Sequence, residues 1–190
     1  LVYGSIARGD IHEKSDIDIV LQYQIPSYRI ELLLDHCPYR IIQKKIIQAT
    51  PNDVIKAHYE LEHNITLTFL LTEYTKLAYE FYLFGGALSF PKLNKNIRVP
   101  GIDKRLVLIK PTEYGHDEFS VFEYQYEIKE ILGISQQIID QRIRVLTKRD
   151  KKGRTGVFLK EVLHPTENIE AKLRKIARTN SIVRRRLRLG

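Results

Sequence analysis

The sequence predicts an α/β (α+β) protein, in which a mixed sheet flanked by helices is followed by a smaller, basic domain. Two observations predict this. Strand-like and helix-like segments alternate through the first half of the chain, and positive charge is concentrated in the second half. Residues 1–95 carry 10 Lys or Arg against 11 Asp or Glu, whereas residues 96–190 carry 21 against 12. We therefore expect a near-neutral domain at 1–95 and a basic domain at 96–190.

The composition is that of a soluble globular protein. At 190 residues, with 43% hydrophobic and 28% charged residues, the chain is long enough for a substantial core. It contains no apolar run long enough to span a membrane. The single cysteine, Cys37, excludes an internal disulfide and predicts a cytoplasmic location. The sequence opens inside an expected strand, so we expect further residues before Leu1.

The first half is predicted element by element. Apolar residues 1–3 predict a strand that turns at Gly4 into a short helix. Later strands rich in Ile, Leu and Thr are expected at residues 17–21, 39–48 and 65–71. Helices are expected at residues 26–37, 50–61 and 73–84. The first of these begins with a proline, and two glycines follow the last.

Two carboxylates stand at the start of the second expected strand. Side chains alternate along a strand, so Asp16 and Asp18 lie on one face. Two neighbouring carboxylates repel each other unless a cation lies between them, and Mg²⁺ is commonly held by one or two carboxylates plus substrate phosphates. Upstream, Gly4 lets the backbone approach a ligand, and Ser5 offers a hydroxyl and an amide at a helix N-terminus. These residues predict a site for Mg²⁺ and phosphate.

The Gly4-Ser5 pair, a short spacer and Asp16-x-Asp18 resemble the signature of the DNA polymerase β superfamily of nucleotidyltransferases. Ala7-Arg8-Gly9 resembles the sequence that follows in its small, minimal-type members. The resemblance implies Mg²⁺-dependent transfer of NMP from an NTP to a hydroxyl, with a two-metal site possible. It implies that Gly4, Ser5 and Arg8 bind the nucleotide, while Asp16 and Asp18 hold the metal and act in catalysis.

Active members of this superfamily carry a third carboxylate on a later strand. The strands expected at 39–48 and 65–71 contain no acidic residue, and the nearest candidates are Asp35, Glu60 and Glu62. We assign Glu62 as the third catalytic residue because it just precedes the second of these strands. Without a third ligand a second metal is poorly held, so nucleotide binding with weak or no transfer is the alternative.

The basic half contains a second pattern. Helices are expected at residues 122–132 and 135–149, where Gly133 makes the turn between them and Ser135 caps the second. This looks like a helix-turn-helix. A basic, glycine-containing segment and a strand-like segment at 157–159 follow, so the region resembles a winged helix, in which the second helix enters the major groove and the wing contacts phosphates.

Specific side chains of this region suit nucleic acid. On the second helix Gln136, Gln137, Gln141 and Arg144 are suited to base edges. The residues suited to phosphates are Arg149, Lys151, Lys152 and Arg154, and Lys148 is a further residue expected to bind nucleic acid. The alternatives are a helical hairpin packed on the sheet and a winged helix that contacts protein. The basic tail at 182–188 either lies on nucleic acid or is a solvated terminus.

The sequence thus predicts a Mg²⁺-dependent nucleotidyltransferase with a second domain that binds DNA or RNA. One alternative is a DNA-binding regulator whose first domain binds nucleotide without efficient catalysis. Another is an enzyme that modifies a protein side chain, although the basic second half argues against it. No histidine has zinc-ligand spacing. The NTP, the acceptor and the oligomeric state stay open.

Overall fold

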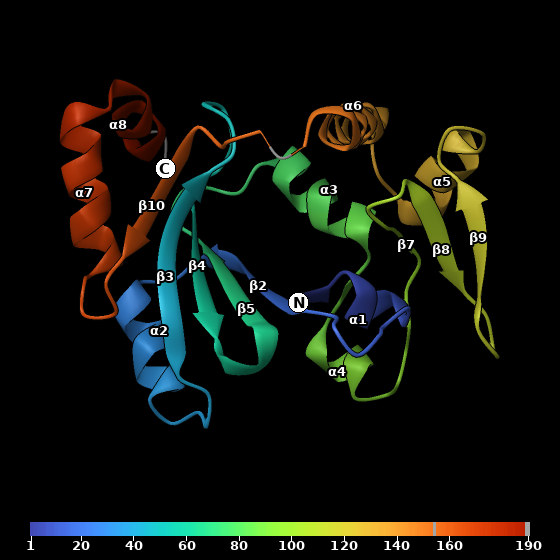
Figure 1. Cartoon of the computed structure of the whole chain (residues 1–190), viewed down its shortest axis with the longest axis horizontal. Coiled ribbons are helices and arrows are strands. Elements are labelled where there is room, and N and C mark those ends of the chain that lie inside the picture. The colour runs from blue at the N-terminus through green and yellow to red at the C-terminus, as the bar shows by residue number, and fades with distance from the viewer. Residues whose placement is uncertain (154, 189–190) are drawn as a thin grey trace. The chain divides into compact units, whose positions relative to one another are not determined.

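The computed structural model describes residues 1–153 and 155–188. Its elements form the predicted mixed α/β fold, with a mixed sheet flanked by helices. Residue contacts divide the chain into two compact units (Figure 1). Unit 1 comprises Leu1–Asp18 and Lys76–Thr155, and unit 2 comprises Ile19–Thr75 and Gly156–Gly190.

These units do not coincide with the predicted boundary at residue 95. The reason is strand β10 (Leu159–Leu163), which pairs antiparallel with β3 (Ile41–Gln48) along its whole length, from Leu159 opposite Gln48 to Leu163 opposite Lys44. Leu159 and Leu163 are buried. The end of the basic half therefore completes a sheet that begins in the near-neutral half, and charge composition does not follow packing.

Unit 2 is built on the strand order β10-β3-β4-β5-β2. Its other elements are β2 (Ile17–Gln24), whose first two residues group with unit 1, α2 (Ser27–Leu34), β4 (Lys56–Leu61), β5 (Ile65–Leu70), α7 (Ile169–Thr179) and α8 (Ser181–Arg188). Helices α2, α7 and α8 lie together on one side of β3 and β10 (Figure 1). The backbone N–H and hydroxyl of Ser27 both donate to the Glu170 carboxylate, which ties α2 to α7.

The helix predicted at residues 50–61 is wrong. The chain there makes a turn and then enters β4, which pairs antiparallel with β5. Ala57, Tyr59 and Leu61 are buried and alternate with less buried residues, which is the period of a strand rather than of a helix. The turn to β5 passes through His63 and Asn64, both with positive φ.

The hydrophobic core of unit 1 is formed by residues of α3, β7, β8, α5 and α6. β1 pairs antiparallel with β6, and β7-β8-β9 form a separate antiparallel sheet. The bounds of its elements are β1 (Val2–Tyr3), α1 (Ser5–Arg8), α3 (Lys76–Gly85), β6 (Ala87–Leu88), α4 (Phe90–Leu93), β7 (Gly101–Ile102), β8 (Val107–Pro111), β9 (His116–Ser120), α5 (Gln125–Leu132) and α6 (Gln136–Lys152).

The two helices of the predicted helix-turn-helix are present as α5 and α6. Gly133 makes the turn with φ 61°, in the left-handed region that suits glycine. Ser135 stands at the N-cap position of α6, but its hydroxyl makes no capping bond and donates instead to the buried Glu80 carboxylate of α3. The α5–α6 pair is therefore anchored on the core of unit 1 through Ile138, Ile139 and Leu146.

The structure does not confirm the predicted wing. The strand after α6 is β10, and in the described part of the chain its partner is β3 rather than a neighbouring strand of a wing. Arg154, predicted to contact phosphate there, lies outside the described residues.

None of the helices within residues 1–153 and 155–188 is both long enough and apolar enough to cross a membrane.

His58 in β4 predicts a pH-dependent loss of stability. Its Nδ1 lies 2.9 Å from the Thr68 hydroxyl, and burial, followed by the charges of Lys56 and Lys45, lowers the pKa of the ring from 6.5 to about 4. The unfolded chain then binds more protons than the folded one between these values, so stability falls as pH drops from about 6.5 to about 4. The loss is at most about 3 kcal/mol, and the partial exposure of the ring reduces it.

Urea unfolding of the wild type and of His58→Gln across this range measures the effect. The wild type should lose more stability than the variant, because glutamine does not titrate. Parallel pH profiles would contradict the assignment.

Candidate functional site

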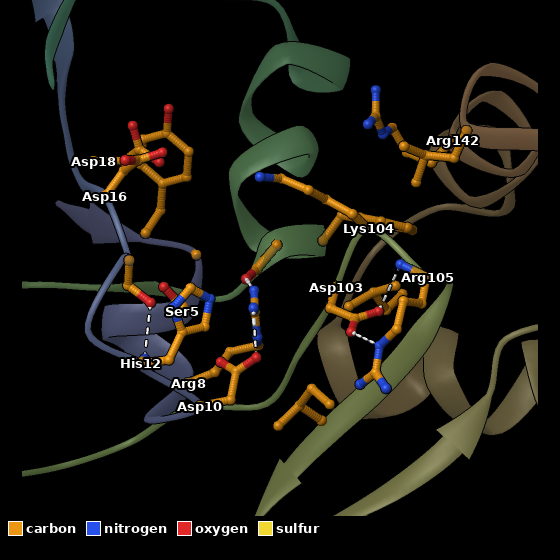
Figure 2. A pocket seen from close by; sticks show the side chains of 18 of the residues that line it. Ser5, Arg8, Asp10, His12, Asp16, Asp18, Asp103, Lys104, Arg105 and Arg142 are labelled. Atoms are coloured by element: carbon orange, nitrogen blue, oxygen red, sulfur yellow. Dashed lines mark hydrogen bonds and ion pairs between the residues drawn. The ribbon is translucent and has the colours of Figure 1, made fainter. Parts of the chain in front are cut away.

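A cavity of about 700 Å³ opens in unit 1 (Figure 2). Its volume is within the usual range for small-molecule sites. All of its lining residues belong to unit 1. They come from the beginning of the chain up to Asp18, from α3, from the segment 102–109 and its partner strand β9, and from α6.

The Gly4 turn forms one wall of the cavity. Gly4 has φ 80° and ψ −146°, a conformation that L-residues avoid, and its N–H donates to the Gly86 carbonyl at 2.9 Å. A Cβ placed on Gly4 would meet no atom within 4 Å. The backbone is therefore fixed while the space beside it stays open. Ser5, the first residue of α1, also lines the cavity.

Arg8 is buried and held by the protein itself. Its guanidinium donates to the Gly85 carbonyl at 2.6 Å and to the Asp10 carboxylate at 2.9 Å. The Nε atom is buried and has no hydrogen-bond partner in the described part of the chain. Arg8 lines the cavity, and the predicted nucleotide contact at this residue stays a prediction.

Asp16 and Asp18 lie side by side on the cavity wall where β2 begins (Figure 2). Asp16 is exposed and Asp18 is half-buried. Burial, and then the negative charge of Asp16, raise the pKa of Asp18, while the positive charge of Lys104 opposes this. Neighbouring carboxylates of this kind interact electrostatically. The side chain of Lys104 comes from the segment between β7 and β8 (Figure 2).

The other walls carry an excess of unpaired positive charge. Two of the lining cations are already neutralised: Arg8 by Asp10, and Arg105 by Asp103 and Glu118, at 2.6 and 2.8 Å. The lining cations that make no ion pair within the described residues are Lys14, Lys104, Arg142 and Arg149. Against these four stand two unpaired carboxylates, Asp16 and Asp18, and the Arg105 cluster adds one surplus negative charge, so the lining Lys, Arg, Asp and Glu carry a net charge of +1. The unpaired cations are suited to binding an anion.

Arg142 is the most unusual of these cations. Its guanidinium lies 5.0 Å from the centre of the Phe81 ring, and its Nε is buried without a partner in the described part of the chain. Burial, and then the positive charge of Arg149, lower the pKa of Arg142. A half-buried guanidinium beside a like charge is costly unless an anion accompanies it.

The structure brings together some of the predicted site residues and leaves others apart. Gly4, Ser5, Arg8, Asp16, Asp18 and Arg149 line the cavity. The side chains predicted to contact nucleic acid that do not line it are Gln136, Gln137, Arg144, Lys148, Lys151 and Lys152, which are exposed, and Gln141, which is half-buried.

Glu62 does not line the cavity. It lies in unit 2, in the turn between β4 and β5, where its carboxylate accepts from the Arg40 backbone N–H and guanidinium, each at 3.2 Å. These contacts lower the pKa of Glu62, and the hydrogen bond from the Arg40 backbone N–H is the largest cause. Its catalytic role stays a prediction. Among the described residues no group of three or more His, Cys, Asp or Glu is placed to hold a metal ion.

Sequence reasoning missed Lys104 and Arg142. A signal for Arg142 exists, because it lies one turn before the apolar Leu146 and two turns before Arg149, on the same side of α6. This spacing places both arginines beside the buried stripe, but it does not reveal the cavity that they line.

Comparison with known proteins agrees with the motif. Residues 1–77 match a family model described as a nucleotidyltransferase domain. No curated protein and no solved structure shows a significant match to the chain. The matched span contains the Gly4 turn and the Asp16–Asp18 pair. The match supports placing the first 77 residues of the chain in the nucleotidyltransferase superfamily.

Proposed function

We propose that this protein binds an NTP with Mg²⁺ in the cavity of unit 1 and transfers NMP from it to a hydroxyl acceptor. The observation that carries the proposal is the combination, in one cavity, of the open Gly4 turn, the Asp16–Asp18 pair and unpaired cations. The first two belong to the part of the chain that matches a nucleotidyltransferase domain.

The carboxylate pair fits Mg²⁺. Asp16 and Asp18 interact closely enough for one to raise the pKa of the other, and a pair of carboxylates completed by substrate phosphates is a common magnesium site. Both residues would hold the ion. Bound Mg²⁺ would supply neutralisation of the phosphate charge that builds up during transfer. Among the described residues no third carboxylate is placed to hold a second ion. The proposal therefore involves a single Mg²⁺ ion.

The chain's own groups would position the nucleotide. The open space beside Gly4 admits the phosphates close to the backbone, and the Ser5 hydroxyl is available to donate to them. Lys104 and Arg142 add positive charge from other walls of the cavity. The acceptor oxygen forms the new bond to the α-phosphorus, the bond to the bridging oxygen breaks, and pyrophosphate leaves. The hydroxyl proton passes to water. Positioning and electrostatics account for catalysis of this type.

The test is transfer from each α-³²P-labelled NTP to hydroxyl-bearing acceptors, by the full chain with Mg²⁺. RNA, DNA and protein are the acceptor arms, and nucleic acid is included because the chain carries a net charge of +8. We expect a labelled acceptor and stoichiometric pyrophosphate with one class of acceptor. Failure of all four NTPs to bind in the presence of Mg²⁺ would contradict the proposal.

A second function is favoured by the lack of a third carboxylate among the described residues. In this alternative the domain binds Mg²⁺ and nucleotide as a regulator and does not transfer NMP. The same experiment separates the two, because a regulator binds nucleotide but releases no pyrophosphate with any acceptor.

Arg142 should contribute to nucleotide binding. Arg142→Gln removes a half-buried cation whose Nε has no hydrogen-bond partner among the described residues, and we expect a loss of about 1.5–3 kcal/mol, or roughly 10- to 100-fold in Mg²⁺–NTP affinity. The matched control is Arg144→Gln, since Arg144 is exposed on the same helix and does not line the cavity. Isothermal titration calorimetry measures both. Similar affinities for the two variants would show that Arg142 does not contact the nucleotide.

A further inference from the structure

A second concentration of positive charge lies in unit 2, on α7 and α8. Residues 169–188 contain eight Lys or Arg against a single acid, Glu170. Glu170 is directed to α2, where it accepts from the Ser27 N–H at 2.6 Å and from the Ser27 hydroxyl at 2.7 Å. The solvent side of the two helices therefore gains no neutralising carboxylate from their own residues.

The cations are segregated from the apolar side of the helices. Ile169, Leu173, Ala177 and Val183 are buried. The exposed cations, which we call the α7–α8 basic face, are Arg174, Lys175, Arg178, Arg184 and Arg185. The two helices share this face, since the Arg184 guanidinium from α8 lies 3.5 Å from the Arg178 carbonyl of α7.

Arg186 adds an unsatisfied cation on α8. Its Nε and Nη2 are buried and have no hydrogen-bond partner within residues 1–153 and 155–188. Buried donors of a charged group are costly when they lack an acceptor.

The chemistry of this face distinguishes between possible partners. In the described part of α7 and α8 no large hydrophobic side chain is exposed. A helix that binds a membrane surface inserts an apolar face, and a stable protein interface has aromatic or apolar anchors at its centre. In these helices the apolar side is already buried in unit 2. A phosphate backbone needs only spaced cations, and arginine, which supplies four of the five, binds phosphate in a bidentate manner.

We propose that the α7–α8 basic face binds the phosphate backbone of a nucleic acid without reading its sequence. This extends the nucleic-acid arm of the proposed function. However, the face belongs to unit 2 and the nucleotide cavity to unit 1, and backbone binding needs neither NTP nor Mg²⁺. Either proposal can therefore fail while the other holds.

The experiment compares two variants of the full chain that each lose four positive charges. One carries Arg174→Gln, Lys175→Gln, Arg178→Gln and Arg185→Gln on the α7–α8 basic face. The competing variant carries Arg144→Gln, Lys148→Gln, Lys151→Gln and Lys152→Gln, the exposed α6 cations for which the sequence predicts contact with nucleic acid. Binding of fluorescein-labelled single-stranded RNA and duplex DNA is measured by anisotropy across a salt series. A smaller variant, Arg174→Gln with Lys175→Gln, is measured in case the first does not fold.

The slope of log affinity against log salt is negative, and each lost phosphate contact reduces its magnitude by about 0.9 for duplex DNA and about 0.7 for single strands. We expect the α7–α8 variant to reduce the magnitude of the slope by about 3. The α6 variant should leave it near the wild-type value, because the strand after α6 pairs with β3 instead of forming the predicted wing. Whether the slope changes with RNA, with DNA or with both identifies the type of nucleic acid. Equal losses in both variants, or a loss confined to the α6 variant, would overturn the proposal. So would binding to phosphatidylserine vesicles without binding to either oligonucleotide.

Discussion

Replacing both Asp16 and Asp18 by Asn should abolish most Mg²⁺-dependent nucleotide binding, with a loss of at least about 100-fold in affinity. Asparagine keeps the shape of each side chain but removes the charge that would hold the cation. A bound metal contributes several kcal/mol to interactions with phosphate, and each 1.4 kcal/mol corresponds to about a tenfold change. Calorimetric titration with each Mg²⁺–NTP measures the loss.

The control removes two carboxylates from the same cavity. Asp103 and Glu118 also line it, but both are engaged by the Arg105 guanidinium. The double variant Asp103→Asn, Glu118→Gln should retain Mg²⁺–NTP affinity within about tenfold, because it removes no proposed metal ligand. Equal losses in the two double variants would disprove the metal assignment.

The raised pKa of Asp18 also predicts a pH dependence. As the pH falls, wild-type metal binding should weaken at a higher pH than it would with an ordinary aspartate, because protons compete for the Asp18 carboxylate at a higher pH.

The largest expected effect on stability is in unit 2, at Glu31. Lys44 is buried, its ammonium lies 2.8 Å from the Glu31 carboxylate, and the Tyr59 hydroxyl donates to the same carboxylate. Among the described residues, Glu31→Ala leaves the ammonium with the Glu167 carbonyl at 3.5 Å and the Tyr59 ring at 5.5 Å, and with no carboxylate. Removing one partner of a buried ion pair costs about 3–5 kcal/mol. We expect a loss near the lower limit because Glu31 is partly exposed.

The neighbouring ion pair provides the control. Lys45 pairs with Glu60, whose side chain is 41% exposed. Glu60→Ala should cost about 1 kcal/mol or less, as for ion pairs at the surface. Urea unfolding followed by circular dichroism gives the free energy of unfolding of both variants. A loss for Glu31→Ala no larger than that for Glu60→Ala would show that burial adds nothing to the Lys44 pair.

The sequence was sufficient for the parts of the site that local backbone rules determine. Gly4, Ser5, Asp16 and Asp18 lie within 15 residues of one another, and a glycine turn and the start of a strand are enough to place them on one cavity. The presence of α5 and α6 was predictable for the same reason, since Gly133 sits in the turn between two amphipathic helices.

Features that depend on distant contacts could not be predicted in this way. Lys104 acts on Asp18 across 86 positions of sequence, and the cavity lining by Arg142 depends on where α6 packs. An apolar stripe shows that a helix is buried on one side but not which neighbour covers it. The sequence predicts a wing with a strand-like segment at 157–159, and it does not reveal that β10 pairs with β3, which lies more than 100 residues earlier. Such pairings follow from the whole fold rather than from local preference.

The discontinuous course of the chain constrains its biogenesis. The chain changes units after Asp18, after Thr75 and after Thr155, so a nascent chain leaving the ribosome completes neither core early. Among the described residues, the last core residue of unit 1 is Leu146. One edge of β3 pairs with β4, and its other edge has no partner until β10 has been synthesised. Until then an unpaired strand edge is exposed to other chains. A truncation at residue 95 would interrupt both units, and we expect such a fragment to aggregate rather than to yield a folded half.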